Sequence, residues 1–251
     1  MKKITIITVT YNCENTLPDT IQSVNQQSRR DEIEYIIIDG QSTDNTLEVI
    51  KNNESGIDKW ISEADKGIYD AMNKGLKMAS GEWVGFLHAD DMFYNEHVVE
   101  SIIEAISSGD YNACYGNLNY IQETPPHNIV RYWKSQTYSS KLLKRGWMPA
   151  HPTVYIKNEL IQKLGYFNTN YKISADYDYM LRLFSNPNTD SLFIDKTIVN
   201  MRLGGVSNNS LKNIIRKSKE DYHTLRTNKV GGLYALFVKN FSKLFQFLAR
   251  N

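Results

Sequence analysis

Cysteine is scarce in this chain of 251 residues, which contains only Cys13 and Cys114. Two cysteines are too few for the disulfide framework of a small secreted protein, and they are typical of packing residues in a reducing compartment. Long apolar runs are missing too, because no stretch approaches the roughly 20 residues that cross a bilayer. The first apolar run is short and is followed by polar residues without a small-residue cleavage site. We therefore expect a cytoplasmic protein that is soluble or lies on a membrane surface.

A large excess of either charge is also absent. The formal net charge is +1, which gives no general case for nucleic-acid binding. The charge is distributed unevenly, because residues 211–251 contain nine Lys or Arg against Glu220 and Asp221. Their local net charge is +7, which leaves −6 on residues 1–210. We expect the two parts of the chain to face different partners.

The hydrophobic residues, 41% of the chain, are sufficient for one large core. Over the first 120 residues, β-rich runs alternate with segments of helical pattern. Strands are predicted at 4–9, 34–39, 59–62, 83–88 and 111–115, and helices at about 16–27, 44–51, 68–79 and 98–106, with Asn95 capping the last helix. This alternation predicts an α/β fold with a largely parallel sheet covered by helices.

Beyond about residue 120 the pattern becomes less regular. Prolines and aromatic residues between residues 125 and 152 favour short strands and loops. A helix is predicted at 173–184 and a strand at 192–203.

The carboxyl ends of the first four predicted strands are polar and mostly acidic. They contain the segments 10–12, 39–44, 63–66 and 88–91. Ligands of parallel α/β sheets bind at the carboxyl ends of the strands, so this clustering predicts a ligand site. Acidic residues after a strand are also common as turn formers and helix caps, and that interpretation stays open for Asp90 and Asp91.

Glycine is missing at the position where a dinucleotide-binding fold needs it. The first strand-to-helix turn, TYNCENT, contains no glycine, and no P-loop is present, so backbone amides are not arranged to hold a pyrophosphate there. A diphosphate would then need a cation to neutralise it. Adjacent carboxylates such as Asp90 and Asp91 favour hard ions such as Mg²⁺, Mn²⁺ or Ca²⁺.

Four segments together resemble the family 2 glycosyltransferases of the GT-A fold, especially bacterial enzymes that build surface polysaccharides. They are ITIITVTYN, EYIIIDGQSTDNT, SEADKGIYDAMNKGLKMASGEWVGFLHADD and ISADYDYMLRL. The resemblance spans residues 3–207. It implies a catalytic domain over 1–207, with a nucleotide-sugar half to about residue 120 and an acceptor half over 121–207. Residues 208–251 are predicted to form a helical basic tail.

The resemblance implies a nucleotide-sugar donor, commonly a UDP-sugar. Thr10 and Tyr11 would lie against the uracil, and Asp39 and Asp65 would bind the nucleoside. The segment His88–Asp91 occupies the position of the metal-binding DXD motif. Within it, Asp90 and then Asp91 would hold Mn²⁺ or Mg²⁺ at the diphosphate. Many relatives have Asp or Asn at the position of His88, whose role therefore stays open between ligand and structure.

The resemblance also assigns the general base to Asp176. The family's Glu-Asp pair reads Ala175-Asp176 here, so the Glu is missing and the Asp remains. Inverting displacement at an anomeric carbon requires a base for the acceptor hydroxyl, and the metal stabilises the departing diphosphate. The alternative for Asp176 is an acidic residue favoured at a helix N-terminus, which is the interpretation we prefer for Asp178.

Two further assignments rest on the resemblance. His151 would border the acceptor pocket, and the loop from Arg202 to Ser207 would close near the diphosphate. Packing roles are the alternative for both. The implied acceptor is a saccharide hydroxyl, with an undecaprenyl-diphosphate-linked sugar as one candidate.

The spacing of apolar and basic residues in the tail predicts an amphipathic basic helix. Its apolar face would carry Leu233, Phe237, Phe241, Leu244 and Leu248, with Lys239, Lys243, Gln246 and Arg250 elsewhere. This helix would either dock on the catalytic domain or lie on an anionic membrane such as the cytoplasmic face of the inner membrane.

Two other functions compete with an inverting, metal-dependent glycosyltransferase. Ala175 and His88 motivate a non-catalytic nucleotide- or sugar-binding module on the same fold. A nucleotidyltransferase is disfavoured, because the chain lacks a Gly-rich, Lys-ending N-terminal loop for triphosphate attack.

Overall fold

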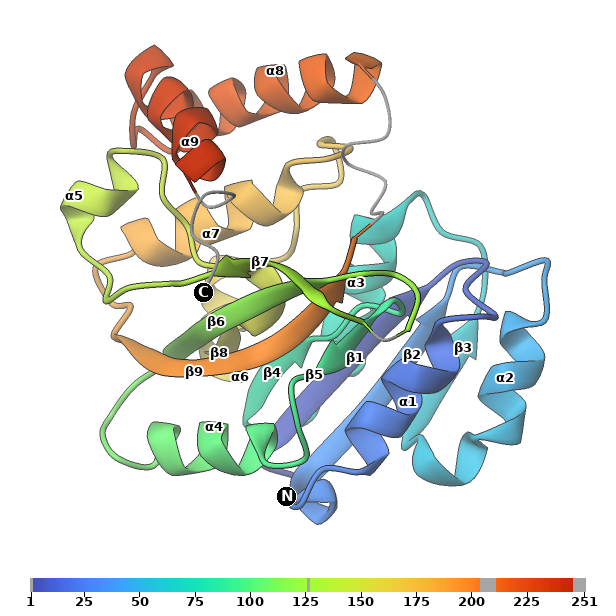
Figure 1. The fold of residues 1–251 in the computed structure, drawn as a ribbon. Coiled ribbons are helices and arrows are strands. Elements are labelled where there is room, and N and C mark those ends of the chain that lie inside the picture. The colour runs from blue at the N-terminus through green and yellow to red at the C-terminus, as the bar shows by residue number, and fades with distance from the viewer. Residues whose placement is uncertain (1, 126, 204–210, 246–251) are drawn as a thin grey trace.

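The computed structural model describes residues 2–125, 127–203 and 211–245, with the backbone alone for 211, 212 and 240–245. The chain folds into one mixed sheet with helices on both faces (Figure 1). The strands are β1 Ile4–Thr10, β2 Ile33–Asp39, β3 Lys59–Ser62, β4 Trp83–Phe86, β5 Asp91–Phe93, β6 Ala113–Ile121, β7 Ile129–Trp133, β8 Tyr155–Lys157 and β9 Ser191–Arg202. The α-helices are α1 Leu17–Asn25, α2 Thr46–Asn52, α3 Ile68–Met78, α4 Val98–Ile106, α5 Ser140–Leu143, α6 Asn158–Leu164, α7 Ala175–Ser185, α8 Leu211–Thr227 and α9 Leu233–Phe245.

The sheet has the order β3-β2-β1-β4-β8-β6-β9-β5, and β7 pairs with β6 outside this path. Strands β3, β2, β1 and β4 are parallel neighbours, as are β6 and β9. Strand β8 joins the two parts through antiparallel pairing with β4 and β6. The predicted α/β class, with parallel strands flanked by helices, is confirmed. Because β1 to β4 are parallel, their carboxyl ends lie at the same end of the sheet.

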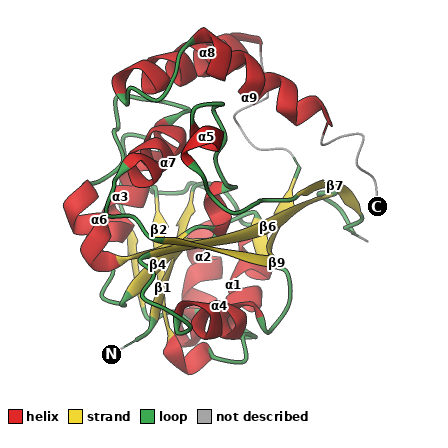
Figure 2. Ribbon diagram, turned by 90° about the vertical axis from the view of Figure 1, so that its left-hand side faces the viewer, coloured by secondary structure: helices red, strands yellow, loops and turns green. Residues whose placement is uncertain are grey.

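Helices cover both faces of the central strands, as Figure 2 shows. Every residue of β1 and β2 is buried, which fits their high content of isoleucine and valine. Alternate residues of β2 enter different cores: Ile36 and Ile38 pack toward α3, α6 and α7, whereas Ile37 packs toward α1, α2 and α4. This period of two follows from the pleat of the strand.

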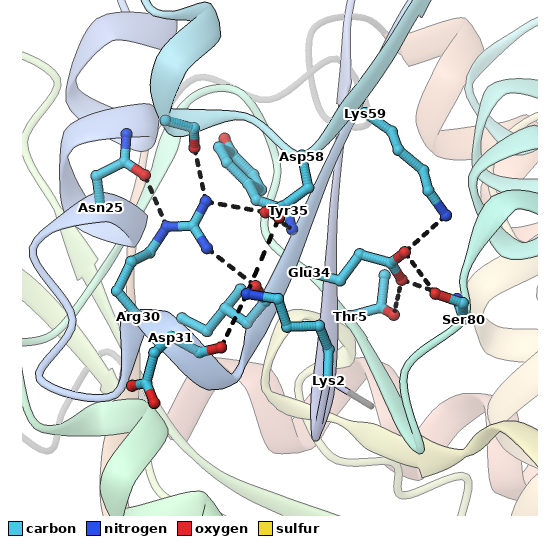
Figure 3. A network of polar contacts seen from close by, with 12 residues as sticks. Lys2, Thr5, Asn25, Arg30, Asp31, Glu34, Tyr35, Asp58, Lys59 and Ser80 are labelled. Atoms are coloured by element: carbon cyan, nitrogen blue, oxygen red, sulfur yellow. Dashed lines mark hydrogen bonds and ion pairs between the residues drawn. The ribbon is translucent and has the colours of Figure 1, made fainter.

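A polar network lies at the amino ends of the strands, at the end of the sheet opposite to the predicted site (Figure 3). The buried Glu34 carboxylate accepts hydrogen bonds from Thr5 at 2.6 Å, Lys59 at 2.7 Å and Ser80 at 2.6 Å. Burial raises the pKa of Glu34, but these donors outweigh that effect and lower the pKa to about 2. The network therefore holds Glu34 ionised.

Several elements differ from the sequence prediction: α5 and α6 were not predicted, and α4, β6 and β5 also depart from it. Helix α4 begins as expected, but Asn95 is not its cap: the Asn95 side chain accepts a hydrogen bond from the backbone N–H of His97, before the helix starts. Strand β6 extends to Ile121 because β9 pairs with it in parallel. Strand β5 was not predicted, since three residues carry no periodic signal.

The tail helices α8 and α9 lie together above α7, red-orange in Figure 1. Leu225 and Ala235 are buried in the core that contains α7, so the tail docks on the rest of the fold. Leu233 and Phe237 are nevertheless 71% and 58% exposed. Lys239, expected on the polar face, is 6% exposed, which corrects that prediction. The reason is a buried partner, Asp221, at 2.7 Å.

The remaining tail predictions fall largely outside the described residues. The side chains of Phe241, Lys243 and Leu244 are not described, nor are residues 246–251, which include Gln246, Leu248 and Arg250. The boundary predicted at 207 falls in residues 204–210, also outside. Among the helices of the described ranges, none is long and apolar enough to cross a membrane.

Candidate active site

The loops after β1 and β2 are bound to each other at the carboxyl edge of the sheet. The backbone N–H of Asn12 donates to the Ser42 hydroxyl at 2.8 Å, and the N–H of Thr43 donates to the Asn12 side chain at 2.9 Å. Asn12 adopts φ +53°, a left-handed conformation that asparagine tolerates better than most residues. These contacts fix the loop that follows Thr10 and carries Tyr11.

Tyr11 and Asp65 meet above Gly40. A Cβ atom at Gly40 would lie 2.4 Å from the Asp65 carboxylate and 3.5 Å from the Tyr11 ring, so a larger residue at position 40 would displace the Asp65 side chain. Tyr11 is 60% exposed and offers a free aromatic face. The Thr10 hydroxyl is buried and has no hydrogen-bond partner among the described residues.

Asp39 is fully buried, and its carboxylate already has donors. It accepts hydrogen bonds from the Ser62 hydroxyl at 2.6 Å and from both the backbone N–H and the hydroxyl of Ser42. In this structure Asp39 orders the loop after β2. The predicted contact of Asp39 with a nucleoside stays a prediction.

The two carboxylates after β4 lie in different environments. Asp90 lines a cavity of about 410 Å³, whereas Asp91 begins β5 and is 1% exposed. Neither carboxylate oxygen of Asp91 has a hydrogen-bond partner in the described part of the chain. Burial, and next the charge of Asp90, raise the pKa of Asp91 well above its ordinary value. The charge of Arg202 opposes this rise.

Arg202 fixes the backbone that carries this motif. The side chain is buried, donates to the backbone carbonyl of Asp90 at 3.2 Å and forms an ion pair with Asp19. Arg202 also lines the cavity beside Asp90. The sequence prediction missed Asp19, because its place in α1 is separated from Arg202 by the whole catalytic region.

Asp176 faces the same cavity from the first turn of α7. Its carboxylate accepts hydrogen bonds from the backbone N–H of Tyr177 at 2.8 Å and from the Tyr69 hydroxyl at 3.3 Å. Burial raises the pKa of Asp176, and the charge of Lys239 opposes this rise. A carboxylate with a raised pKa accepts a proton more readily, which suits a general base.

Two histidines lie between the carboxylates. The His88 and His151 rings are 6.1 Å apart, and His151 lines the cavity. Burial lowers the pKa of His88, while the charges of Asp90 and Asp176 oppose this change. Burial, with His88 adding to it, lowers the pKa of His151 to about 3. His151 is therefore neutral at ordinary pH.

Aromatic side chains form the far wall of the cavity. Tyr120, Trp133 and Trp147 line it, and the Tyr120 and Trp133 rings stack with centroids 6.4 Å apart. The cavity lining thus combines acidic, basic and aromatic side chains. The aromatic side chains suit the apolar face of a sugar ring.

The donor set for a cation is incomplete without a ligand. No group of three or more His, Cys, Asp or Glu side chains arranged to hold a metal occurs within residues 2–125, 127–203 and 211–245. Mg²⁺ is commonly held by one or two carboxylates together with substrate phosphates. Asp90, and Asp91 with its unpaired oxygens, fit that partial set.

The comparison that decides the family is a match of residues 5–177 to Glycosyl transferase family 2. The chain belongs to that family. Among curated family relatives, a PGL/p-HBAD biosynthesis glycosyltransferase of Mycobacterium bovis is 28% identical over 207 residues, which are 81% of this chain and 78% of that protein.

The fold of this family 2 glycosyltransferase is shared by solved structures. The 1–349 fragment of TarS from S. aureus, in complex with UDP-GlcNAc, gives a TM-score of 0.70 at 18% identity and covers 91% of this chain. The chain spans 66% of that fragment and 39% of a longer TarS structure. The mannosyltransferase PcManGT from Pyrobaculum calidifontis, with GDP-Man and Mn²⁺, gives a TM-score of 0.68 at 15% identity and covers 95% of this chain and 69% of its own. These likenesses establish the GT-A fold of the glycosyltransferase.

The family match ends at Tyr177. It includes Thr10, Tyr11, Asp39, Asp65 and Asp176 together with the Asp90-Asp91 pair. Arg202 and helices α8 and α9 lie beyond it in the glycosyltransferase.

Proposed function

We propose that this glycosyltransferase transfers a sugar from a nucleotide-sugar donor to a saccharide hydroxyl with inversion at the anomeric carbon. The observation that carries the proposal is the convergence of Asp90, Asp176 and Arg202 on one cavity. One carboxylate lies at the strand end where a diphosphate would bind, and the other begins a helix beside the aromatic wall. Two carboxylates at separate places along the cavity suit in-line displacement, in which the attacking hydroxyl and the departing diphosphate lie on opposite sides of the anomeric carbon.

The donor is proposed to be a UDP-sugar. The exposed ring of Tyr11 offers a stacking face for a base, with Asp65 and the buried Thr10 hydroxyl beside it. The TarS complex contains UDP-GlcNAc and the PcManGT complex contains GDP-Man, so the base must be tested directly.

A divalent cation, Mn²⁺ or Mg²⁺, is proposed to bind at Asp90, with Asp91 as a second carboxylate. When bound, such a cation would neutralise the diphosphate of the leaving group. Arg202, which is paired with Asp19, holds the Asp90 backbone in place. Mn²⁺ in the PcManGT structure supports this choice of metal class.

Asp176 is proposed as the base that accepts the proton of the acceptor hydroxyl. Hydrogen bonds from Tyr69 and the Tyr177 backbone orient its Oδ1, and its burial favours proton uptake. Direct attack on an α-linked donor would give a β-linked product.

The acceptor is proposed to be lipid-linked, with an undecaprenyl-diphosphate-linked saccharide as the candidate class. Exposed Leu233, Tyr234 and Phe237 on the positively charged tail favour contact with an anionic surface. The enzyme would then act in the cytoplasm, at the cytoplasmic face of the inner membrane.

A non-catalytic binding module remains the second candidate, because Ala175 replaces the family's Glu. The test is a screen of UDP- and GDP-sugars with Mn²⁺ or Mg²⁺ and lipid-diphosphate saccharides. We expect nucleoside diphosphate release that requires both metal and acceptor. Binding of a donor without turnover across the panel would favour the module.

A further inference from the structure

The C-terminal helices reach the segment that carries Asp176, although the family match ends before them. The Glu220 carboxylate of α8 accepts hydrogen bonds from three consecutive backbone N–H groups just before α7: those of Lys172 at 3.1 Å, Ile173 at 2.9 Å and Ser174 at 3.0 Å. The N-cap residue of α7, Ser174, makes no side-chain cap of its own. Glu220 therefore anchors, from another helix, the segment that leads into α7, including the backbone N–H of its N-cap residue.

A buried ion pair also joins α8 and α9 next to this segment. Lys239 of α9 and Asp221 of α8 are 6% and 2% exposed and meet at 2.7 Å. Asp221 also accepts a hydrogen bond from the Ser174 hydroxyl at 2.8 Å. The Lys239 ammonium lies 3.2 Å from the centroid of the Tyr177 ring. The pair thus contacts residues on both sides of Asp176 in the chain.

Stability alone is a weak explanation for this pair. A buried ion pair is often no more stabilising than apolar residues of the same volume, because both charges lose their water. Lys239, Asp221 and Asp176 instead line the same cavity. The Lys239 charge also acts on the Asp176 carboxylate, which gives the pair a connection to the site.

We propose that the buried Lys239–Asp221 pair is a positioning element that holds the Asp176 carboxylate toward the cavity in its ionised, proton-accepting form. The inference rests on the function proposed above and extends it to the tail. The tail helices would then be part of the active enzyme, since they complete the surroundings of its base.

The charges around Asp176 are consistent with this role. The groups that face it are Tyr69 from α3, His88 after β4, Lys217 and Asp221 from α8, and Lys239 from α9. Burial raises the pKa of Asp176, and Lys239 is the foremost charge opposing that rise. Loss of the Lys239 charge should therefore move proton uptake by Asp176 to higher pH.

The test compares Lys239→Met with Lys239→Arg, which keeps the charge, and with Lys219→Met, which removes an exposed lysine from α8. We expect Lys239→Met to lower kcat for transfer about tenfold or more at unchanged donor KM, because small misplacement of a reacting group costs up to about 100-fold. The acidic limb of its pH profile should move to higher pH. Lys239→Arg should restore the limb, and Lys219→Met should match the parent enzyme.

A second readout needs no turnover. The ¹³C resonance of the Asp176 carboxyl, assigned by its loss in Asp176→Asn, is titrated in the protein without substrate. A higher midpoint in Lys239→Met than in Lys239→Arg supports the proposal, whereas equal midpoints overturn it. If the parent protein transfers no sugar, the proposed function fails even if the midpoint moves.

Folding is controlled by the double variant Lys239→Met/Asp221→Asn, which removes both charges and leaves no buried unpaired ion. A melting transition near that of the parent, with the kcat loss retained, supports positioning. Recovery of kcat in the double variant, or loss of the transition in both variants, would assign the pair to stability and overturn the proposal.

Discussion

At the residue scale, the two cavity carboxylates are prepared for different tasks by their surroundings. Asp176 is half-buried beside Tyr69; burial raises its pKa, and the charge of Lys239 opposes this rise. Asp90 lies at the end of a strand, with its backbone held by Arg202. The first environment suits proton acceptance, and the second suits a metal that arrives with a diphosphate.

Substitution of Asp90 tests the metal assignment. Asp90→Asn removes one ligand charge, so we expect the Mn²⁺-dependent gain in affinity for UDP to fall at least tenfold, as measured by isothermal titration with and without Mn²⁺. Asp110→Asn, a loop carboxylate remote from the cavity, is the matched control. If Asp91→Asn loses as much Mn²⁺-dependent affinity for UDP as Asp90→Asn does, both carboxylates are assigned to the metal. Unchanged metal-dependent affinity in both would remove the assignment.

At the element scale, regular segments were predictable from sequence and long-range partners were not. The strand Lys59–Ser62 and the helix Val98–Ile106 match the prediction, because their apolar periodicity is local. The contact between Lys239 and Asp221 was not predicted, since two helices joined by a turn give no periodic signal for a buried ion pair. The convergence of the strand ends was predictable from parallel topology alone.

The polar network at the far edge of the sheet gives a prediction about strands β1, β2 and β3. The pKa of Glu34 lies below its unfolded value of 4.5, so its contribution to stability is fully present above pH 4.5 and is lost as pH falls toward about 2. Solvent screens part of this interaction, so we expect Glu34→Gln to lower the free energy of unfolding by about 1–2 kcal/mol at pH 7.

Urea unfolding at several pH values measures this effect. The difference between the parent protein and Glu34→Gln should shrink between pH 4.5 and the lowest pH at which both fold. Glu48→Gln, a change on α2 outside the network, should leave unfolding nearly unchanged. A difference that stays constant with pH would show that Glu34 acts by packing and not by charge.

At the scale of the whole molecule, the tail helices use two faces differently. One face brings Ala235 and Lys239 against the catalytic region, and the other exposes Leu233 and Phe237. Docking and membrane contact, which the sequence left as alternatives, are therefore compatible. Docking is seen directly, and membrane contact stays a prediction.

Liposome co-sedimentation tests that outer face. Leu233→Ser/Phe237→Ser should reduce binding to anionic liposomes severalfold, because burial of apolar side chains and attraction to anionic lipid act together. Ile129→Ser, on β7 and outside the tail helices, removes an equally exposed apolar side chain as the control. High salt should weaken the parent's binding, since charges are screened over about 8 Å at physiological ionic strength. Equal binding by all three proteins, or binding that ignores anionic lipid, would argue against membrane contact.

The central claim is that Asp176 takes up the proton of the acceptor hydroxyl during sugar transfer. Its most direct test measures transfer and donor affinity of Asp176→Asn on one preparation, with Asp110→Asn as control. We expect transfer to fall by about 100- to 10,000-fold, the usual contribution of a general base, while donor affinity stays within about twofold. Near-normal transfer by Asp176→Asn, with its melting temperature unchanged, would contradict the account and move the base to another residue.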